Sequence, residues 1–181
     1  MTTATTRIHP PGDGERPDRA HPSRMLRVGT VLWNRYEITA VMGATKLGEV
    51  WRCTDRQTGK EVILRQLSAD MRRSKQAMAL IHMGIRRISH QSHPHLAVTR
   101  QMVYMGDEIY LIGDFAPGVD IGTWGRVGVD HKRTVAEVLP KLQQVAAALD
   151  FAHAAQVVHR DVKPSNIYLA SDGVVRVTDF C

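Results

Sequence analysis

The sequence predicts an α+β fold in which a five-stranded antiparallel sheet with one helix precedes a mainly helical part. Short runs rich in β-branched and aromatic residues recur between residues 36 and 112, and turns containing Gly or Asp separate them. Two longer segments, 71–89 and 134–152, instead place apolar residues at helical spacing. These observations predict the sheet, the helix within it and the helix that follows it.

Five strands are expected, and together they are predicted to form one antiparallel sheet. Their ranges are 36–42, 49–54, 61–67, 97–105 and 108–112. The turn at 55–60 and the Gly106-Asp107 turn carry the residue types that favour chain reversal.

The first helix is expected at residues 71–89. Its apolar stripe consists of Met78, Ile81, Ile85 and Ile88, at the spacing of one helix face. This stripe supports the helical assignment.

The second helix begins with a capping-box pattern, in which Thr134 is followed three residues later by Glu137. Pro140 falls beyond the first turn, so we expect it to kink the helix or to shift its start. Apolar residues lie on nearly every face between residues 138 and 152. Such a helix requires cover on all sides, but the elements that should cover it are missing from the sequence, so we expect it to leave a large apolar patch.

A polar loop at residues 159–166, with the sequence His-Arg-Asp-Val-Lys-Pro-Ser-Asn, separates two apolar runs at 157–158 and 167–169. Each run is expected to form a short strand. A loop held between two strands presents its polar side chains at one point.

This loop closely resembles the catalytic loop of the eukaryotic-type protein kinases, and the Lys two residues after the Asp is typical of their serine/threonine branch. The resemblance implies that Asp161 is the catalytic base that orients the attacking hydroxyl. It implies that Lys163 stabilises the transferred phosphoryl group, and that Asn166 contributes to catalysis and holds Mg²⁺.

The segment 43–50 is similar to the glycine-rich loop of the same family, which covers the phosphates of ATP. Gly43, Gly48 and Val50 match the pattern, which implies that they bind the nucleotide. Thr45 stands in place of the middle glycine. Its β-branched side chain should restrict the close approach of the backbone to phosphates.

Arg65, on the third expected strand, stands where the family has its phosphate-binding Lys. Arginine keeps the charge, but its planar fork is not equivalent to an ammonium group. The family pairs this Lys with a Glu on the following helix. That position falls near Gly84, and Asp70 and Asp107 are the only acidic residues between Glu61 and Glu108.

Residues 114–118 resemble the hinge between the two kinase lobes, which implies that backbone groups of Asp114 and Ala116 bind adenine. Gly113 is small for the position behind the adenine pocket. We expect it to leave extra volume or to let Met102 fill the space. Asp120 stands where the family often has a polar group near the ribose.

Asp179 and Phe180 resemble the start of the Asp-Phe-Gly motif, in which Asp coordinates magnesium. The resemblance implies that Asp179 and Asn166 hold Mg²⁺. Cys181 replaces the glycine and is the last residue, so this end of the site is expected to be hard to hold in place.

The resemblance implies a protein-kinase-like fold. Residues 1–30 are expected to form a disordered tail, residues 31–116 the N-lobe, and residues 117–181 a truncated, mainly helical C-lobe. ATP and Mg²⁺ are the implied cofactors, and a protein substrate or a regulatory protein is the implied partner.

Two functions are compatible with these residues. One is a serine/threonine protein kinase that transfers phosphoryl groups from ATP to proteins, with doubtful activity in this chain. The alternative is a pseudokinase, a nucleotide- or protein-binding regulatory module. Thr45, Arg65, Cys181 and the missing Glu favour the alternative, whereas Asp161 and its loop favour the enzyme.

The composition and residue patterns also bear on three other classes of protein: those that bind nucleic acid, those that bind a metal, and those that are secreted or span a membrane. Residues 62–106 hold seven Lys or Arg and one Asp. A nucleic-acid patch is less well supported there than a solvated helix face, because interleaved aromatic residues are missing. The histidines between residues 90 and 95 lack a nearby Cys or carboxylate for a metal site. The sequence has no secretory h-region or apolar run for a membrane span, and its two cysteines give no disulfide framework, so a cytoplasmic location is expected.

Overall fold

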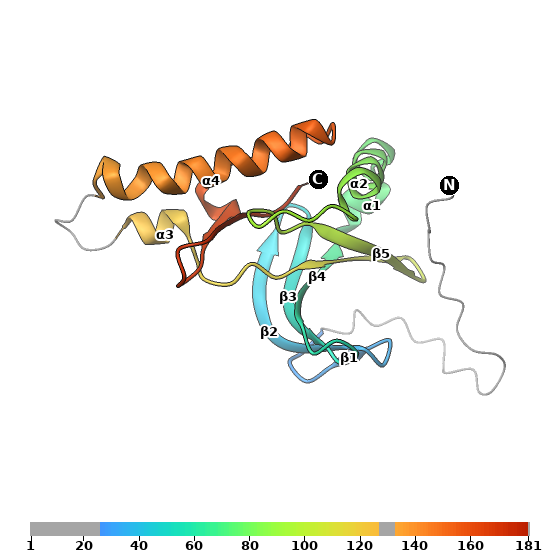
Figure 1. Cartoon of the computed structure of the whole chain (residues 1–181). Helices are drawn as coiled ribbons and strands as arrows, with labels where there is room; N and C mark the ends of the chain where they lie inside the picture. The colour runs from blue at the N-terminus through green and yellow to red at the C-terminus, as the bar shows by residue number, and fades with distance from the viewer. Residues whose placement is uncertain (1–25, 127–132, 181) are drawn as a thin grey trace.

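The computed structural model describes residues 26–126 and 133–180. The tail expected at 1–30 lies outside these residues as far as residue 25, and Cys181 also lies outside them. The described chain forms a large curved sheet with two helices, followed by a small sheet with further helices beside it (Figure 1). This arrangement confirms the predicted α+β class.

The large sheet has six strands in the order β1-β2-β3-β4-β6-β5, and every neighbouring pair is antiparallel. The strands are β1 (Val31–Leu32), β2 (Tyr36–Thr45), β3 (Gly48–Asp55), β4 (Glu61–Leu67), β5 (Thr99–Met105) and β6 (Glu108–Asp114). The five predicted strands are all present, so the predicted count is one too low. The extra strand is β1, which folds back onto β2 through positive φ angles at Trp33 and Asn34. Two residues are too few to leave an alternating pattern in the sequence.

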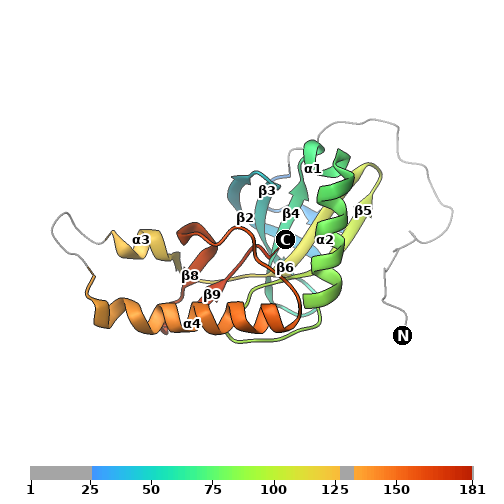
Figure 2. The same cartoon turned by 90° about the horizontal axis from the view of Figure 1, so that it is seen from above.

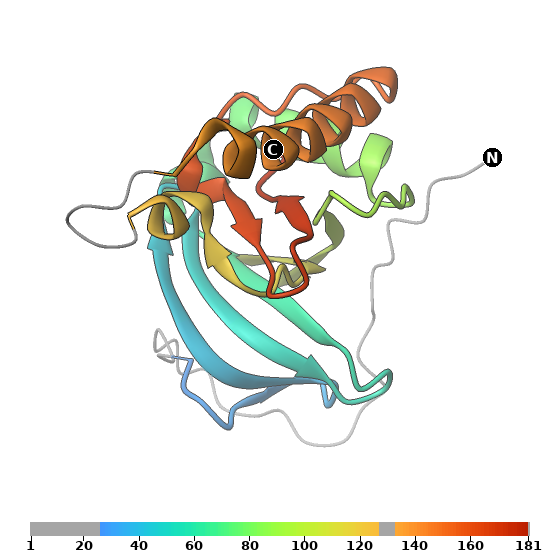
Figure 3. The ribbon, with the colours of Figure 1, turned by 60° about the vertical axis from the view of Figure 1, so that its left-hand side comes forward.

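The sheet is strongly curved, as Figure 3 shows, and buried apolar side chains form separate clusters on its two faces. On one face, Ile38, Trp51 and Leu64 lie in a buried cluster. On the other face, Leu67 and Leu111 pack with Ile81 of the helix layer. Apolar side chains therefore cover both faces of the sheet. A side chain on a central strand such as β4 is then buried, even when it carries a charge.

The predicted helix at 71–89 is two helices, α1 (Ala69–Arg73) and α2 (Lys75–Ile88). The break lies at Ser74, which has extended backbone angles and accepts a hydrogen bond from the Ala77 amide through its Oγ at 3.2 Å. Serine competes with helical hydrogen bonding in this way, so the single-helix prediction was wrong. The predicted apolar stripe of α2 does pack inward, with Ile81 and Ile88 buried.

The part of the described chain that follows the large sheet is built around a three-stranded sheet in the order β7-β8-β9. Its elements are β7 (Val119–Asp120), α3 (Ile121–Gly125), α4 (Val135–Ala154), the 3₁₀ turn η1 (Pro164–Asn166), β8 (Ile167–Leu169) and β9 (Val175–Val177). Val157 and Val158 form no strand, contrary to prediction. Val157 is buried in the core, whereas Val158 is exposed.

The long helix α4 runs beside β8 and β9 (Figure 2). Its buried residues are Val145, Ala148 and Ala152, which pack against the small sheet. The capping box of Thr134 and Glu137 is confirmed, and the helix begins at Val135.

Pro140 lies inside α4, which still begins at Val135, so the shifted start, one of the two effects expected of this proline, does not occur. The exposed apolar patch expected on this helix is confirmed. Val135, Leu139 and Leu142 are 79%, 51% and 50% exposed. None of the helices within residues 26–126 and 133–180 has the length and apolar character that a membrane crossing requires.

Candidate functional site

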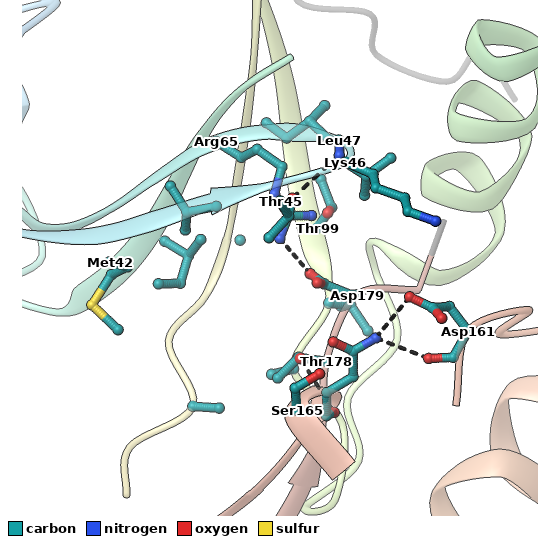
Figure 4. A pocket seen from close by; sticks show the side chains of 18 of the residues that line it. Met42, Thr45, Lys46, Leu47, Arg65, Thr99, Asp161, Ser165, Thr178 and Asp179 are labelled. Atoms are coloured by element: carbon teal, nitrogen blue, oxygen red, sulfur yellow. Dashed lines mark hydrogen bonds and ion pairs between the residues drawn. The ribbon is translucent and has the colours of Figure 1, made fainter. Parts of the chain in front are cut away.

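A cavity of about 770 Å³ lies where the two sheets meet. The segment before β5 and strand β9 of the small sheet are joined there by a parallel bridge between Leu96 and Val177. In this bridge the Ala97 amide donates to the Val177 carbonyl at 2.9 Å. The cavity is lined by the β2–β3 hairpin, β4, α2, the ends of β5 and β6, the loop before β8 and the segment after β9 (Figure 4). The segments singled out by the sequence therefore share one cavity.

The loop before β8 is held from inside by His159, which is buried. Its Nδ1 accepts a hydrogen bond from the Asp161 amide at 3.2 Å, so its Nε2 carries the proton and donates to the Thr178 carbonyl at 2.7 Å. Burial lowers the pKa of His159, which keeps the imidazole neutral. Neutral His159 thus ties the loop to the segment before Asp179.

Asp161, Lys163 and Asn166 come together as predicted. The Lys163 Nζ lies 2.5 Å from the Asp161 Oδ2. The Asn166 amide nitrogen donates to the Asp161 carbonyl at 2.9 Å and to Oδ2 at 3.3 Å. The hydrogen bond from Lys163 is the largest cause that lowers the pKa of Asp161, so this carboxyl is ionised at neutral pH.

Arg65 projects into the cavity from the centre of the large sheet, where its backbone pairs with Val50 and Leu111. Its side chain is only 8% exposed, and its Nη2 lies 2.7 Å from the Asp179 Oδ1. Its Nε is buried without a hydrogen-bond acceptor. Asp179 has a φ of 62°, a conformation that non-glycine residues rarely adopt. The residue at the phosphate-binding position is therefore an ion-pair partner of Asp179.

Helix α2 contributes only apolar side chains to the cavity lining. These are Ala77, Leu80 and Ile81. Gly84, the position where a Glu was expected from the resemblance, is buried and has no side chain to offer. Arg65 thus meets no carboxylate from α2, in agreement with the sequence analysis.

At the other end of the cavity, Asp114 and Ala116, to which the resemblance assigns adenine binding, both line the wall. The two Asp114 carboxylate oxygens accept from Arg100 Nε at 2.8 Å and Nη2 at 2.6 Å. Asp120 does not reach this cavity. It caps α3 and accepts from the Thr123 amide at 2.9 Å.

Gly113 does not open extra space, contrary to expectation. A Cβ built there would lie 2.8 Å from the Val98 carbonyl oxygen and 3.1 Å from the Thr99 Cα. A register shift between Thr99 and Gln101 accompanies this close approach of β5. The neighbouring backbone, rather than the Met102 side chain, therefore occupies the space.

The β2–β3 hairpin covers the cavity, and Gly43 and Val50 line it. Gly48, predicted as a nucleotide-binding residue, does not. It lies against β4, where an added Cβ would be 1.8 Å from the Gln66 carbonyl oxygen. Thr45 closes the turn, since its Oγ1 accepts from the Leu47 amide at 3.2 Å.

Lys46 lines the cavity and was not predicted as a site residue. Figure 4 shows its side chain reaching from the hairpin turn toward the side that carries Asp161. Its place between the two matched glycines was the only available signal. His159 was missed as well, because its role depends on the contact with Thr178 across the loop.

The residues predicted to hold Mg²⁺, Asn166 and Asp179, line the same cavity but do not fit a divalent cation as they stand. All three carboxylates of the described cavity lining are paired with cations, Asp114 with Arg100, Asp161 with Lys163 and Asp179 with Arg65. Asn166 directs its amide nitrogen at Asp161. Among residues 26–126 and 133–180, no three His, Cys, Asp or Glu side chains cluster to bind a metal, the histidines of 90–95 included.

Comparison with known proteins gives a family match that includes these residues. The family model described as "Protein kinase domain" matches residues 36–181. The serine/threonine-protein kinase PknA of Mycobacterium tuberculosis is 30% identical over 163 residues, which are 85% of this chain and 36% of PknA. Human NUAK family SNF1-like kinase 1 is 27% identical over 151 residues, which are 82% of this chain and 22% of that protein. The chain thus spans about a third or less of the length of these relatives.

Solved structures agree on the fold. The Mycobacterium tuberculosis PknI kinase domain superimposes with a TM-score of 0.75 at 25% identity, over 86% of this chain and 62% of that one. Rad53, residues 1–466, in complex with AMP-PNP gives a TM-score of 0.66 at 22% identity, over 81% of this chain and 38% of that one. The family match extends over most of the sequence, and the chain belongs to the protein kinase domain family.

Proposed function

We propose that this chain binds ATP in the cavity between its two sheets and forms the phosphoryl-transfer centre of a serine/threonine protein kinase. The observation that carries the proposal is the convergence of the hairpin, the loop bearing Asp161 and the segment bearing Asp179 on one cavity. Segments so distant in sequence meet only in the folded chain. That Rad53, with the same fold, was solved with AMP-PNP supports an adenine nucleotide as the ligand.

The geometry around Asp161 suits a base that orients a hydroxyl group. Lys163 and Asn166 both bond its Oδ2, and within the described residues no partner is recorded for Oδ1. Oδ1 can therefore accept the proton of a substrate hydroxyl. The hydroxyl oxygen then bonds to the γ-phosphorus while the bond from that phosphorus to the bridging oxygen of ADP breaks.

Lys163 places its ammonium group beside Asp161, at the point where the transferred phosphoryl group passes. A cation there offsets the negative charge that develops on the phosphoryl oxygens. The substrate class is a protein Ser or Thr side chain. Its support is the Asp-x-Lys spacing and the serine/threonine-protein kinase names of the relatives.

The test combines binding and transfer. The folded chain, in buffer with MgCl₂, is titrated with ATP and with adenosine while its melting temperature is followed, and then incubated with γ-labelled ATP and casein. A ligand that binds only the folded state raises the melting temperature. We expect a shift with ATP, and transfer that Asp161→Asn lowers at least about a hundredfold while the ATP shift remains. No shift with either ligand, from a folded sample, would refute the proposal.

The alternative function, a nucleotide-binding regulatory module without turnover, is favoured by one observation. Arg65 is engaged with Asp179, and α2 supplies no carboxylate to draw it toward a phosphate-binding position. Transfer chemistry depends on accurate positioning, so this arrangement disfavours turnover more than binding. An ATP-induced shift with no labelled casein would select this alternative.

A further inference from the structure

We infer that this cavity binds a nucleoside triphosphate without a divalent cation, with Arg65 serving as the counter-charge to Asp179 and Lys46 as an additional phosphate ligand. The inference rests on the proposed nucleotide site and specifies how that site handles the negative charge of the triphosphate. Three features of the cavity carry it.

The first feature is the state of Asp179. Its carboxylate is held at 2.7 Å by a guanidinium group that is 8% exposed. Arg65 bonds Oδ1 of this carboxylate, so a divalent cation bound to Oδ2 would lie beside the buried guanidinium group. Two positive charges so close together repel each other strongly where solvent is excluded. Arg65 therefore already supplies, beside Asp179, the positive charge that a metal ion would supply.

The second feature is the charge of the lining. The described cavity residues include the cations Lys46, Arg65, Arg160 and Lys163. Its three carboxylates are all engaged in ion pairs, one of them with Arg100 from outside the lining. Lys46 and Arg160 enter none of the ion pairs recorded for the described residues. This excess of unpaired positive charge suits a polyanion.

The third feature is unused hydrogen-bonding capacity on the same cations. Arg65 lines the cavity and bonds Asp179 through Nη2, and no hydrogen bond of its Nη1 is recorded within the described residues. Lys46 lines the cavity and reaches from the hairpin turn toward the side that carries Asp161 (Figure 4). Phosphate oxygens are strong acceptors for arginine and lysine. Both residues therefore gain from a triphosphate without the help of a metal.

The experiment is isothermal titration of the 181-residue chain with ATP in EDTA and, separately, in excess MgCl₂. We expect ATP to bind at least as tightly in EDTA as in MgCl₂, because the site takes the metal-free triphosphate, whereas ATP in excess MgCl₂ carries Mg²⁺ on its phosphates. Binding that is more than about threefold weaker in EDTA than in MgCl₂ would overturn the inference while leaving the nucleotide site intact. Absence of ATP binding in both buffers would instead refute the proposed function itself.

Two variants separate the protein's cations from a metal. In EDTA, Arg65→Gln should weaken ATP binding about tenfold or more, because a charge-assisted hydrogen bond is removed. Asp179→Asn should tighten ATP binding in EDTA, because it frees Arg65 and removes a like charge. Loss of binding in Asp179→Asn, from a sample that melts cooperatively, would contradict the assigned role of Arg65.

Lys46→Gln tests the second cation, and Lys60→Gln is its matched control. Lys60 is exposed in the turn between β3 and β4 and does not line the cavity. Both changes remove one positive charge, but only Lys46→Gln should weaken ATP binding in EDTA, by about tenfold. Equal effects of the two would mean that overall charge alone attracts the nucleotide, and would overturn the role of Lys46.

Discussion

Arg100 holds both carboxylate oxygens of Asp114, with its Nε and Nη2 at 2.8 Å and 2.6 Å. The same guanidinium donates through Nη1 to the carbonyls of Ser89 and Gln91, at 2.8 Å and 2.6 Å. One side chain thus joins the end of α2 to the end of β6, where the cavity begins. The relative positions of the helix and the cavity wall depend on it.

Arg100→Gln is therefore expected to destabilise the fold. The pair is about a third exposed, so solvent screening limits the loss to about 1–2 kcal/mol in the free energy of unfolding. Urea unfolding measures it. Arg56→Gln, which removes an arginine from the exposed pair with Glu37, is the matched control and should cost at most about 0.5 kcal/mol. Equal losses would show that the four hydrogen bonds of Arg100 add nothing.

The carboxyl group of Asp55 is expected to make stability depend on pH in the acid range. It is buried and accepts hydrogen bonds from Arg35 at 2.9 Å and 2.7 Å, from the Gln57 amide and from Thr58. The bonds from Arg35 are the largest cause that holds the pKa of Asp55 well below its usual range. A lowered pKa in the folded state means that the stabilisation is complete above the unfolded pKa of about 3.9 and is lost as pH falls toward the folded value.

Asp55→Asn should accordingly lower the free energy of unfolding by about 2–3 kcal/mol at pH 7. The difference between variant and parent should shrink as the pH is lowered below about 4, because the parent then loses the same interaction. Urea unfolding at pH 7 and at pH 3 measures both differences. A difference that is the same at the two pH values would contradict this account of Asp55.

The exposed apolar face of α4 is expected to make the chain self-associate. Val135, Leu139 and Leu142 lie at i, i+4 and i+7 on one face of the helix and are at least half exposed. Sedimentation velocity over a range of protein concentrations should show association. The double variant Leu139→Glu/Leu142→Glu should reduce it, whereas Val158→Glu, at an exposed site outside α4, should not. A parent chain that stays monomeric at every concentration would show the idea to be wrong.

Gly48 and Gly43 give a paired test of the hairpin. Both have positive φ, of 142° and 111°, but only at Gly48 does an added Cβ collide with backbone, at 1.8 Å from the Gln66 carbonyl oxygen. Gly48→Ala should lower the free energy of unfolding by about 3 kcal/mol, and Gly43→Ala by about 1 kcal/mol. Thermal and urea unfolding compare the two. Similar losses would mean that φ alone, and not the contact with β4, fixes the glycine.

Local patterns in the sequence were enough to predict the main elements. Alternation placed β3 and β4 within one residue of their observed ends, and Thr134 with Glu137 fixed the start of α4. The loop with Asp161 was predicted from its own eight residues. These features depend on neighbours along the chain, so the sequence contains the information directly.

The features that were not predicted depend on contacts across the fold. Strand β1 exists only because β2 offers it a partner. The ion pair of Arg65 and Asp179 joins residues 114 positions apart, and nothing in either segment signals the other. The crowding of Gly113 likewise comes from the irregular pairing of β5. Such contacts follow from the packing of the sheets rather than from local residue pattern.

The crowding at Gly113 has a consequence for chemical probes. A small residue at this position invites the use of adenine analogues with a bulky substituent, on the assumption that the missing side chain leaves a hole for it. Here the Val98 carbonyl and the Thr99 Cα already lie where a Cβ would project. A bulky substituent directed at Gly113 toward β5 would meet backbone, which cannot rotate aside as a side chain does. Selective ligands for this protein should instead extend toward the apolar wall that α2 contributes through Ala77 and Leu80.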